Sequence, residues 1–545
     1  MTIEGEAYTG LYYIAGCIGD MTSASISDST NLGIITMKGT SNNTMYLSGI
    51  TASCNEATNC VNGKKGDKSE VKAGSITYNN ANNAQILCMS GISDKHKGNV
   101  SYCENHGTIS AFGISTKQCY IGGIVRSANG SNSQIVSYCN NSGKIYIDAN
   151  ITGITNLAGI AQSTTKNVTI LACHNSGDIE IAQTANIANL CHLAGILALA
   201  TDVTGFTLDG CSNSGNITVY GRTNACRAGG LMGSYMRSAA KSTITMTINN
   251  GFTNSGNITT TDTSTATTYN MGGLIGVTKG GLNGTTNVVS KIVINGDVVN
   301  NGKITCNFTS FTETPRIGGI VGTIEHNGQI EANGKLTNNG EVSSDSDFET
   351  KYGIYLGGIV GSMQSIGGFT GWGEITNNGK ISLKSSGIAW TATAGFCGLF
   401  NAVERTHAII LKKGFTNNGE LYTHYTSEGG IIRCGGFLGN SSSDSETKAK
   451  TNIRIIDHLT NNTPITVDGE DGKSIATICI AGLFGLMDNA GTLTFESCTV
   501  TNTEKGDLKV TENVNTTSIM QMGGVAANFQ RKFTPDGTGV NVINK

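Results

Sequence analysis

The 16 cysteines of this 545-residue chain are the residues best equipped for chemistry, because thiols form disulfides and bind zinc. Most recur at fixed positions of a repeated motif that Phe, Val, Leu or Ile fill in other copies. Four of them occupy one position of the motif: Cys103, Cys139, Cys173 and Cys211. Cys191 and Cys226 occupy a second position. Equivalent side chains on stacked strands run parallel about 4.8 Å apart, farther than the Cβ atoms of a disulfide. We therefore predict that these thiols are reduced and buried.

Two cysteines, Cys54 and Cys60, lie in an irregular segment at 51–72 and are the best candidates for a bridge. Metal binding is disfavoured, because the chain has no Cys-x-x-Cys pair and its Cys-His dipeptides at 173–174 and 191–192 lack zinc spacing. We predict no metal site and no cofactor.

Carboxylate chemistry would require acids clustered on neighbouring parts of the fold, as glycoside hydrolysis does. The 39 Asp and Glu residues are instead scattered, and many fall in loops. We predict that the chain is not an enzyme. A polysaccharide lyase or hydrolase is the catalytic alternative.

A different chemistry, stacking on sugar rings or on a protein partner, is available to aromatic residues in a connection of variable length. In consecutive repeats this connection contributes seven candidate ligand-binding residues: Phe308, Phe311, Tyr352, Tyr355, Trp390, Tyr422 and Tyr425. If the repeats stack, these residues form an aromatic stripe beside Ser and Thr hydroxyls. The alternative is that they cover the loop side of the core.

Two short motifs define the elements that would position these residues. The first consists of a large apolar residue, a small residue, a glycine and another apolar residue, as in IGGIV at 121–125 and LGGIVG at 356–361. It has fourteen copies. Its key glycines run from Gly16 to Gly524, which is 508 residues over thirteen intervals, so the mean period is near 39 residues.

The second motif, Asn-x-Gly, lies between copies of the first and is usually preceded by an apolar residue or Cys. We predict that its asparagines point inward and form a ladder of amide hydrogen bonds, while its glycine supplies a left-handed turn. The ladder residues are Asn105, Asn141, Asn175, Asn213, Asn254, Asn300, Asn338, Asn377 and Asn417.

Each repeat contains three short strand-like runs, none of which can bury its apolar side alone. Abundant Gly (74 residues) and scarce Pro (3) suit short strands joined by tight turns rather than helices. We predict an all-β chain that folds as a right-handed parallel β-helix, or β-solenoid, of about 13–14 coils with three short strands per coil. The array spans 1–545 as one domain, with coils from about 14 to 526 and a C-terminal tail at 527–545. Separate β-sandwich domains would not reuse one Asn and one Gly position in nearly every repeat.

The succession of GGIVG, a variable loop, an Ile-x-x-Cys-x-Asn-x-Gly run and a final Ile resembles the GLUG-type repeats of large bacterial surface proteins. The resemblance is clearest in IGGIVRSANGSNSQIVSYCNNSGKI at 121–145 and covers roughly 14–510. It implies a secreted or surface-anchored, adhesin-like protein. The Asn-Asn-Gly and Asn-Ser-Gly corners and the longer period depart from the commonest form.

The net charge of −3 and the absence of Lys or Arg runs do not indicate a surface for nucleic acid. No apolar span in the sequence reaches the length of a transmembrane helix. The residues after Met1 lack the pattern of a signal peptide, so we expect a piece of a longer chain that is exported by a signal elsewhere. We predict a noncatalytic extracellular or cell-surface scaffold that binds a glycan, a host protein or a neighbouring chain through its variable loops. A stalk or filament subunit without its own ligand is the alternative.

Overall fold

The computed structural model describes residues 1–545 except 5–10, 39–42, 81–85, 129–132, 238–242, 284–285, 347–351, 386–389, 403–407, 427, 442–449, 472, 489, 512–513, 530–532, 537–540 and 545. The chain divides into two compact units. Unit 1 comprises residues 1–235 and 244–263, and unit 2 comprises residues 236–243 and 264–545. The described residues form strands and turns and no helix. Among them there is accordingly no helix with the length and apolarity that crossing a membrane requires.

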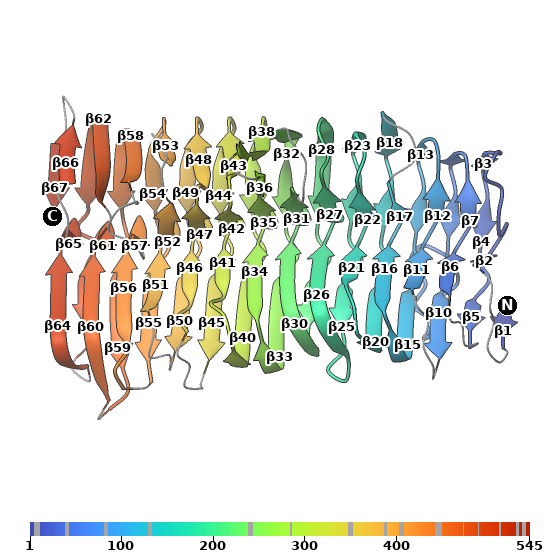
Figure 1. Ribbon diagram of the computed structural model, residues 1–545, viewed down its shortest axis with the longest axis horizontal. Coiled ribbons are helices and arrows are strands. Elements are labelled where there is room, and N and C mark those ends of the chain that lie inside the picture. Colours follow the sequence, from blue (N-terminus) through green and yellow to red (C-terminus); the bar gives the residue numbers. More distant parts are fainter. Residues whose placement is uncertain are drawn as a thin grey trace. The chain divides into compact units, whose positions relative to one another are not determined.

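Unit 1 is a parallel β-solenoid, in which each coil contributes one strand segment or two to each of three faces (Figure 1). A representative coil places β20 (Ile145–Ile151) and β21 (Thr155–Ala158) on face A, β22 (Ala161–Thr164) on face B, and β23 (Val168–Leu171) and β24 (His174–Asn175) on face C. The next coil follows in parallel register with β25 (Ile179–Ile181), β26 (Asn186–Ala194), β27 (Leu197–Thr201) and β28 (Phe206–Asn213). The predicted fold class, an all-β parallel solenoid, is confirmed.

Unit 2 has the same architecture. Its face A carries β40 (Ile304–Phe311), β45 (Val342–Ser346), β50 (Ile381–Ser385), β55 (Leu421–Tyr425) and β59 (Ile465–Gly469), followed in each coil by β41 (Arg316–Gly318), β46 (Tyr355–Gly357), β51 (Trp390–Ala394), β56 (Ile431–Gly435) and β60 (Ser474–Ala481). Face B carries β42 (Val321–Glu325), β47 (Val360–Ser365), β52 (Cys397–Ala402), β57 (Leu438–Ser441) and β61 (Phe484–Met487). Face C includes β44 (Leu336–Asn338), β49 (Ile375–Asn377), β54 (Phe415–Asn417) and β58 (Lys450–Asn461).

Strict alternation of side chains separates the core from the surface of each face. In β50 the side chains of Ile381 and Leu383 are buried, whereas Ser382 and Lys384 point outward. Parallel register then aligns inward residues of successive coils, so that Ile381 lies between Val342 and Leu421. Stacking therefore completes an apolar core that no single coil could bury alone.

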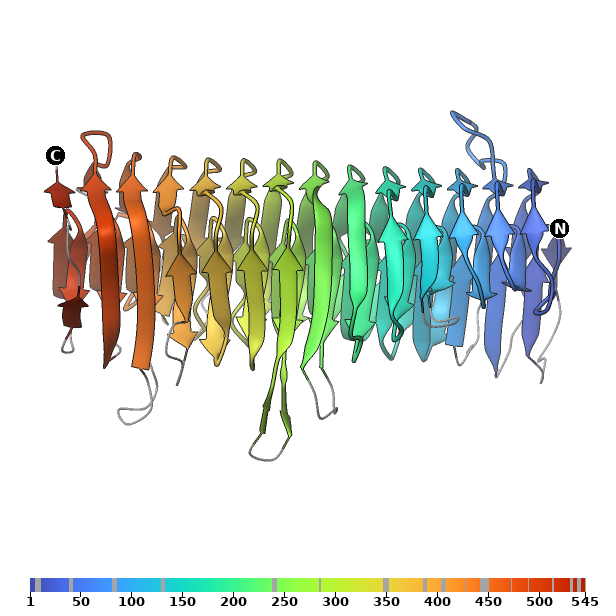
Figure 2. The same ribbon diagram turned by 90° about the horizontal axis from the view of Figure 1, so that it is seen from above.

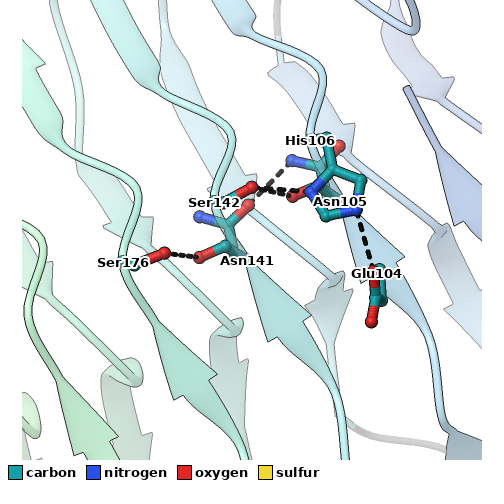
Figure 3. A network of polar contacts seen from close by, with 6 residues as sticks. All are labelled: Glu104, Asn105, His106, Asn141, Ser142 and Ser176. Carbon is teal, nitrogen blue, oxygen red and sulfur yellow. Dashed lines mark hydrogen bonds and ion pairs between the residues drawn. The ribbon is translucent and has the colours of Figure 1, made fainter. Parts of the chain in front are cut away.

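Within each unit the asparagines of the second motif lie in a buried row at the corner that follows face C. In unit 1, Asn105 donates from Nδ2 to Asn141 Oδ1 at 2.8 Å (Figure 3). Asn141 donates to Asn175 in the same way. In unit 2, Asn338, Asn377 and Asn417 repeat the arrangement. The remaining ladder residues lie in the same rows: Asn213 and Asn254 in unit 1, Asn300 in unit 2. Asn62 and Asn502 also belong, although no Gly follows two residues later.

The glycine of this corner has a different role from the one predicted. Left-handed φ angles occur three residues before the ladder asparagine, as at Tyr138 (φ 54°) and Ala172 (φ 48°). The corner glycine is required instead by close packing, since a Cβ on Gly143 would lie 2.1 Å from Gly107 O and 2.5 Å from Asn105 Nδ2. The prediction of a left-handed turn at this glycine is therefore wrong.

The cysteine rows are buried. The Sγ of Cys139 points to the Val100 carbonyl oxygen of the preceding coil at 3.7 Å, and Cys173 repeats this contact with Val136 at 3.5 Å. All 16 cysteines are free thiols, so the bridge between Cys54 and Cys60 is wrong. Cys60 aligns with the same row because β9 (Val61–Asn62) pairs with β14 (Glu104–Asn105). Cys54 instead ends β7 (Thr51–Cys54) on face B of the same coil, so the two cysteines belong to different faces.

Cys17 is the one exposed thiol of the chain, which predicts a simple reactivity pattern. We expect a water-soluble disulfide reagent to titrate about one thiol in the native protein and all 16 after denaturation without reductant, because burial withholds the others from the reagent. Cys17→Ser should remove the native signal. Four or more bridges in the denatured, unreduced protein would contradict the structure.

Two variable connections project beyond the turns of their own unit (Figure 2). The first, at 63–74 in unit 1, is an insertion in the corner after Asn62, whose Nδ2 reaches Gly74 O at 2.8 Å. The second is the antiparallel pair β36 (Gly281–Asn283) and β37 (Thr286–Val288) of unit 2. The first insertion leaves the ladder intact, since Asn62 still donates to Asn105 Oδ1 at 2.8 Å.

Candidate functional site

The aromatic candidates do not form one exposed stripe. Phe308, Phe311, Tyr355 and Tyr425 are buried, so their assignment to a ligand surface is wrong. Alternation explains the burial of two of them, because Phe308 and Tyr425 lie four residues after the inward Ile304 and Leu421.

Three aromatic candidates remain at the surface: Tyr352 and Tyr422 are partly exposed and Trp390 is 39% exposed. Trp390 lies over the Arg433 guanidinium, at 4.9 Å from ring centroid to Cζ. Tyr352 packs at its inner side against Phe311. Tyr422 lines a cavity of substantial size.

This cavity is an open groove of about 450 Å³ on the outer side of face A in unit 2. It crosses β40, β45, β50 and β55, and register aligns the residues of its lining in rows. The first row holds hydroxyls and the Tyr422 ring: Thr305, Ser343, Ser382 and Tyr422. The second row holds titratable side chains: Asp345, Lys384 and His424 in the lining, and Asp468 next to His424 outside it.

Asp468 fixes the aromatic end of the groove. Its Oδ2 accepts a hydrogen bond from Tyr422 OH at 2.9 Å and lies 3.0 Å from His424 Nδ1. Its Oδ1 accepts a hydrogen bond from Thr511 Oγ1 at 2.5 Å. Burial opposes ionisation, but these hydrogen bonds outweigh it and lower the pKa of Asp468. Burial and then the Asp468 carboxylate raise the pKa of Tyr422 to about 12. At neutral pH the carboxylate is thus charged and the phenol protonated.

Ion pairs between successive coils hold the charged side chains along the groove. Lys303 Nζ lies 2.9 Å from Glu341 Oε2, and Lys384 Nζ lies 3.6 Å from Asp345 Oδ1. These exposed pairs add little stability individually. Their consequence is a surface dense in hydrogen-bond donors and acceptors beside one oriented aromatic ring, which suits a ligand with many hydroxyl groups.

A serine, a histidine and a glutamate of unit 1 contact one another in the order used by serine hydrolases (Figure 3). Ser142 Oγ lies 2.6 Å from His106 Nδ1, and His106 Nε2 lies 2.8 Å from Glu104 Oε2. Acyl transfer also needs amide donors for an oxyanion. The N–H groups of Ser142 and Gly143 instead both donate to the Asn105 carbonyl, at 2.8 and 3.1 Å.

The repeat explains this contact without catalysis. His106 and Ser142 occupy the same position, directly after the ladder asparagine, in consecutive coils. Exposed asparagines fill this position in unit 2 and contact one another in the same way, as Asn378 does with Asn339 at 2.9 Å. We assign the Ser142–His106 contact to the stacked outer column of the corner.

Unit 1 also buries two histidines that stay neutral. Burial and, to a smaller extent, the charge of Arg227 lower the pKa of His192 to about 3, and its Nδ1 lies 2.9 Å from Ser234 Oγ. Burial likewise lowers the pKa of His96 to about 4. Both values lie below the ordinary histidine value of 6.5.

These histidines predict a loss of stability in acid. The imidazole of His192 takes up a proton near pH 6.5 in the unfolded chain but only near pH 3 in the folded chain. Its contribution to the free energy of unfolding is therefore complete above pH 6.5 and is lost as the pH falls. Between those values each pH unit of acidification should cost about 1.4 kcal/mol. We expect His192→Asn, the residue of the preceding coil (Asn156), to flatten this dependence between pH 7.5 and 5 in thermal unfolding. Parallel pH dependence in the two proteins would contradict the burial of a neutral imidazole.

Within the described ranges, no group of three His, Cys, Asp or Glu side chains lies close enough to hold a metal ion. Comparison of the chain with models of known protein families, with curated proteins and with solved structures gives no match.

Proposed function

We propose that this chain is a noncatalytic, adhesin-like repeat scaffold that binds a glycan through the outer side of face A in unit 2. The observation that carries this proposal is the groove of about 450 Å³, whose hydroxyl, amide and charged side chains surround the Tyr422 ring. Saccharides are recognised by many hydrogen bonds together with contact between a sugar face and an aromatic ring.

The protonation states in the groove support binding rather than cleavage. Hydrolysis or elimination needs a proton donor and a proton acceptor whose pKa values lie near the working pH. The lowered pKa of Asp468 and the raised pKa of Tyr422 move both groups away from that range. Glu341 and Asp345 are each paired with a lysine. A lyase or hydrolase is therefore the less favoured function.

A bacterial cell-surface or secreted location is part of this proposal, and it is supported by the resemblance of 121–145 to GLUG-type repeats. Oxidising compartments convert accessible thiols into disulfides. Fifteen of the 16 thiols here are buried, and burial raises the pKa of Cys119 to about 12, so little reactive thiolate forms. Burial thus makes free cysteines compatible with export.

A glycan and protein array probed with the full chain tests the proposal. We expect binding to a saccharide, and we expect Tyr422→Ala to weaken it at least about tenfold, the effect of losing one good contact. Trp372→Ala is the matched control, because Trp372 is an exposed aromatic residue of the same unit outside the groove.

An equal loss of affinity in the two variants would show that the groove is not the binding site. Binding to nothing on the array would favour a stalk or filament subunit. Release of products from a polysaccharide would show that the chain is an enzyme.

A further inference from the structure

Unit 1 contains a second cavity, of about 290 Å³, on its face B. It crosses β7 (Thr51–Cys54), β12 (Ser93–His96) and β17 (Val125–Ser127), and its lining combines three cations with three hydroxyls: Lys95, Lys97 and Arg126, then Thr22, Ser53 and Ser127. Register places Ser53, Lys95 and Ser127 in one row. Thr22 comes from the coil before β7, so the cavity is assembled from four consecutive coils.

Arg126 is held in place by a carboxylate that does not line the cavity. Its Nε lies 2.6 Å from Oδ1 of Asp94, which is fully buried. Burial alone would lower the pKa of Arg126, but Asp94 raises it, so the guanidinium stays charged. Asp94 thus acts as a positioning residue for a cation at the cavity wall.

Lys95 is fixed by two aromatic residues. Its Nζ lies 3.0 Å from Tyr13 OH and 4.0 Å from the centroid of the Tyr46 ring, and the two rings stack at 4.9 Å. A cation–π contact of this kind orients an ammonium group without neutralising it. Lys97, at the rim, is exposed.

The lining of the cavity holds three cations and no carboxylate. Three carboxylates lie near the lining residues: Asp94 beneath Arg126, Asp20, which is exposed and accepts a hydrogen bond from Thr22 Oγ1 at 2.5 Å, and Glu56, whose charge adds to burial in raising the pKa of Cys54. The positive groups therefore face the cavity, whereas none of these carboxylates belongs to its lining. His96 adds no charge at neutral pH, because burial lowers its pKa to about 4.

We propose that this cavity binds the sulfate or carboxylate group of an acidic saccharide. Guanidinium and ammonium groups form strong, charge-assisted hydrogen bonds with such oxyanions, and the Thr22, Ser53 and Ser127 hydroxyls can serve neighbouring sugar hydroxyls. The identification of a saccharide as the carrier rests on the proposed function, whereas the oxyanion site stands on the cavity itself.

Calorimetric titration of the full chain with three tetrasaccharides of equal length, one sulfated, one carboxylated and one neutral, tests this site. We expect at least one acidic tetrasaccharide to bind, more weakly at 0.5 M salt because exposed charges are screened. Lys97→Glu should weaken that binding about tenfold, a change of about 1.4 kcal/mol. Lys117→Glu is the matched control, since it makes the same charge change on an exposed lysine of unit 1 outside the cavity.

Several outcomes would overturn the site. The first is an equal loss of affinity in the Lys97 and Lys117 variants, and the second is no binding of either acidic tetrasaccharide. The third is binding of the neutral tetrasaccharide as tight as that of the acidic ones, with an affinity that Lys97→Glu does not change. Arg126→Lys should also weaken binding, because Lys cannot reproduce the guanidinium fork, and Lys97→Glu still decides if that variant does not fold. Loss of acidic binding in Tyr422→Ala but not in Lys97→Glu would move the ligand to the groove of unit 2, leaving the proposed function intact and this site refuted.

Discussion

Asn377→Ala should lower the free energy of local opening in unit 2 by about 3–9 kcal/mol, counting about 1–3 kcal/mol for each of three buried groups that lose a hydrogen-bond partner. Asn377 donates from Nδ2 to Asn417 Oδ1 at 2.8 Å and to Gly379 O at 2.9 Å, and it accepts from Asn338 Nδ2 at 2.8 Å. Water cannot replace these contacts, because the side chain is fully buried. Hydrogen exchange of amides in β49 and its neighbours measures the change as local opening.

The adjacent residue is the matched control. Asn378 stacks in an outer ladder, donating to Asn339 and accepting from Asn418 at 2.9 Å each, but it is exposed. Asn378→Ala should therefore change stability by less than about 0.5 kcal/mol. Similar losses in the two variants would mean that burial of the inner ladder contributes nothing.

Gly358→Ala should be at least as damaging, because the two repeated motifs touch at this residue. A Cβ on Gly358 would lie 2.2 Å from Gly395 O in the next coil and 2.4 Å from Asn377 Cγ. Neither atom can withdraw without separating coils or breaking the ladder, so we expect a loss of more than about 3 kcal/mol. Thermal unfolding and expression in soluble form provide the measurement.

Gly281→Ala serves as the comparison in the same unit. Its Cβ would meet its nearest neighbour, Arg237 Cγ, at an ordinary 3.5 Å. We expect a change within about 0.5 kcal/mol. Tolerance of Gly358→Ala equal to that of Gly281→Ala would refute the close contact between the motifs.

The coil corner was predictable from sequence because it repeats. Each of these coils buries an asparagine at the same place, and most have a glycine two residues later, so the alignment of Asn141 with Asn175 is visible in the sequence. The turn was assigned to the wrong residue because φ is not visible in the motif. Ala172 takes the left-handed conformation in a position that Tyr138 and Gly210 fill in neighbouring coils.

Strand alternation accounts for part of the aromatic pattern. Leu421 points inward, so alternation places Tyr425 inward and Tyr422 outward. Phe311 is buried although it lies seven residues after the inward Ile304, so alternation alone does not predict the exposure of every candidate.

The groove and the cationic cavity carried no signal of this kind. Tyr422, Asp468 and Thr511 come from three coils and meet only through register, as Lys95 and Arg126 do in unit 1. Each is a single substitution in a variable position of its own repeat. Only the structure brings such residues together.

Hydrogen exchange of the full chain, recorded with and without the neutral saccharide that an array identifies, tests the assignment of the groove most directly. Ligand contact should slow exchange where the groove is lined. We predict reduced deuterium uptake in β45, β50 and β55, loss of that protection in Tyr422→Ala, and unchanged uptake in β49 and β54 on face C. Protection confined to face C or to unit 1, or no protection anywhere, would contradict a saccharide site on face A.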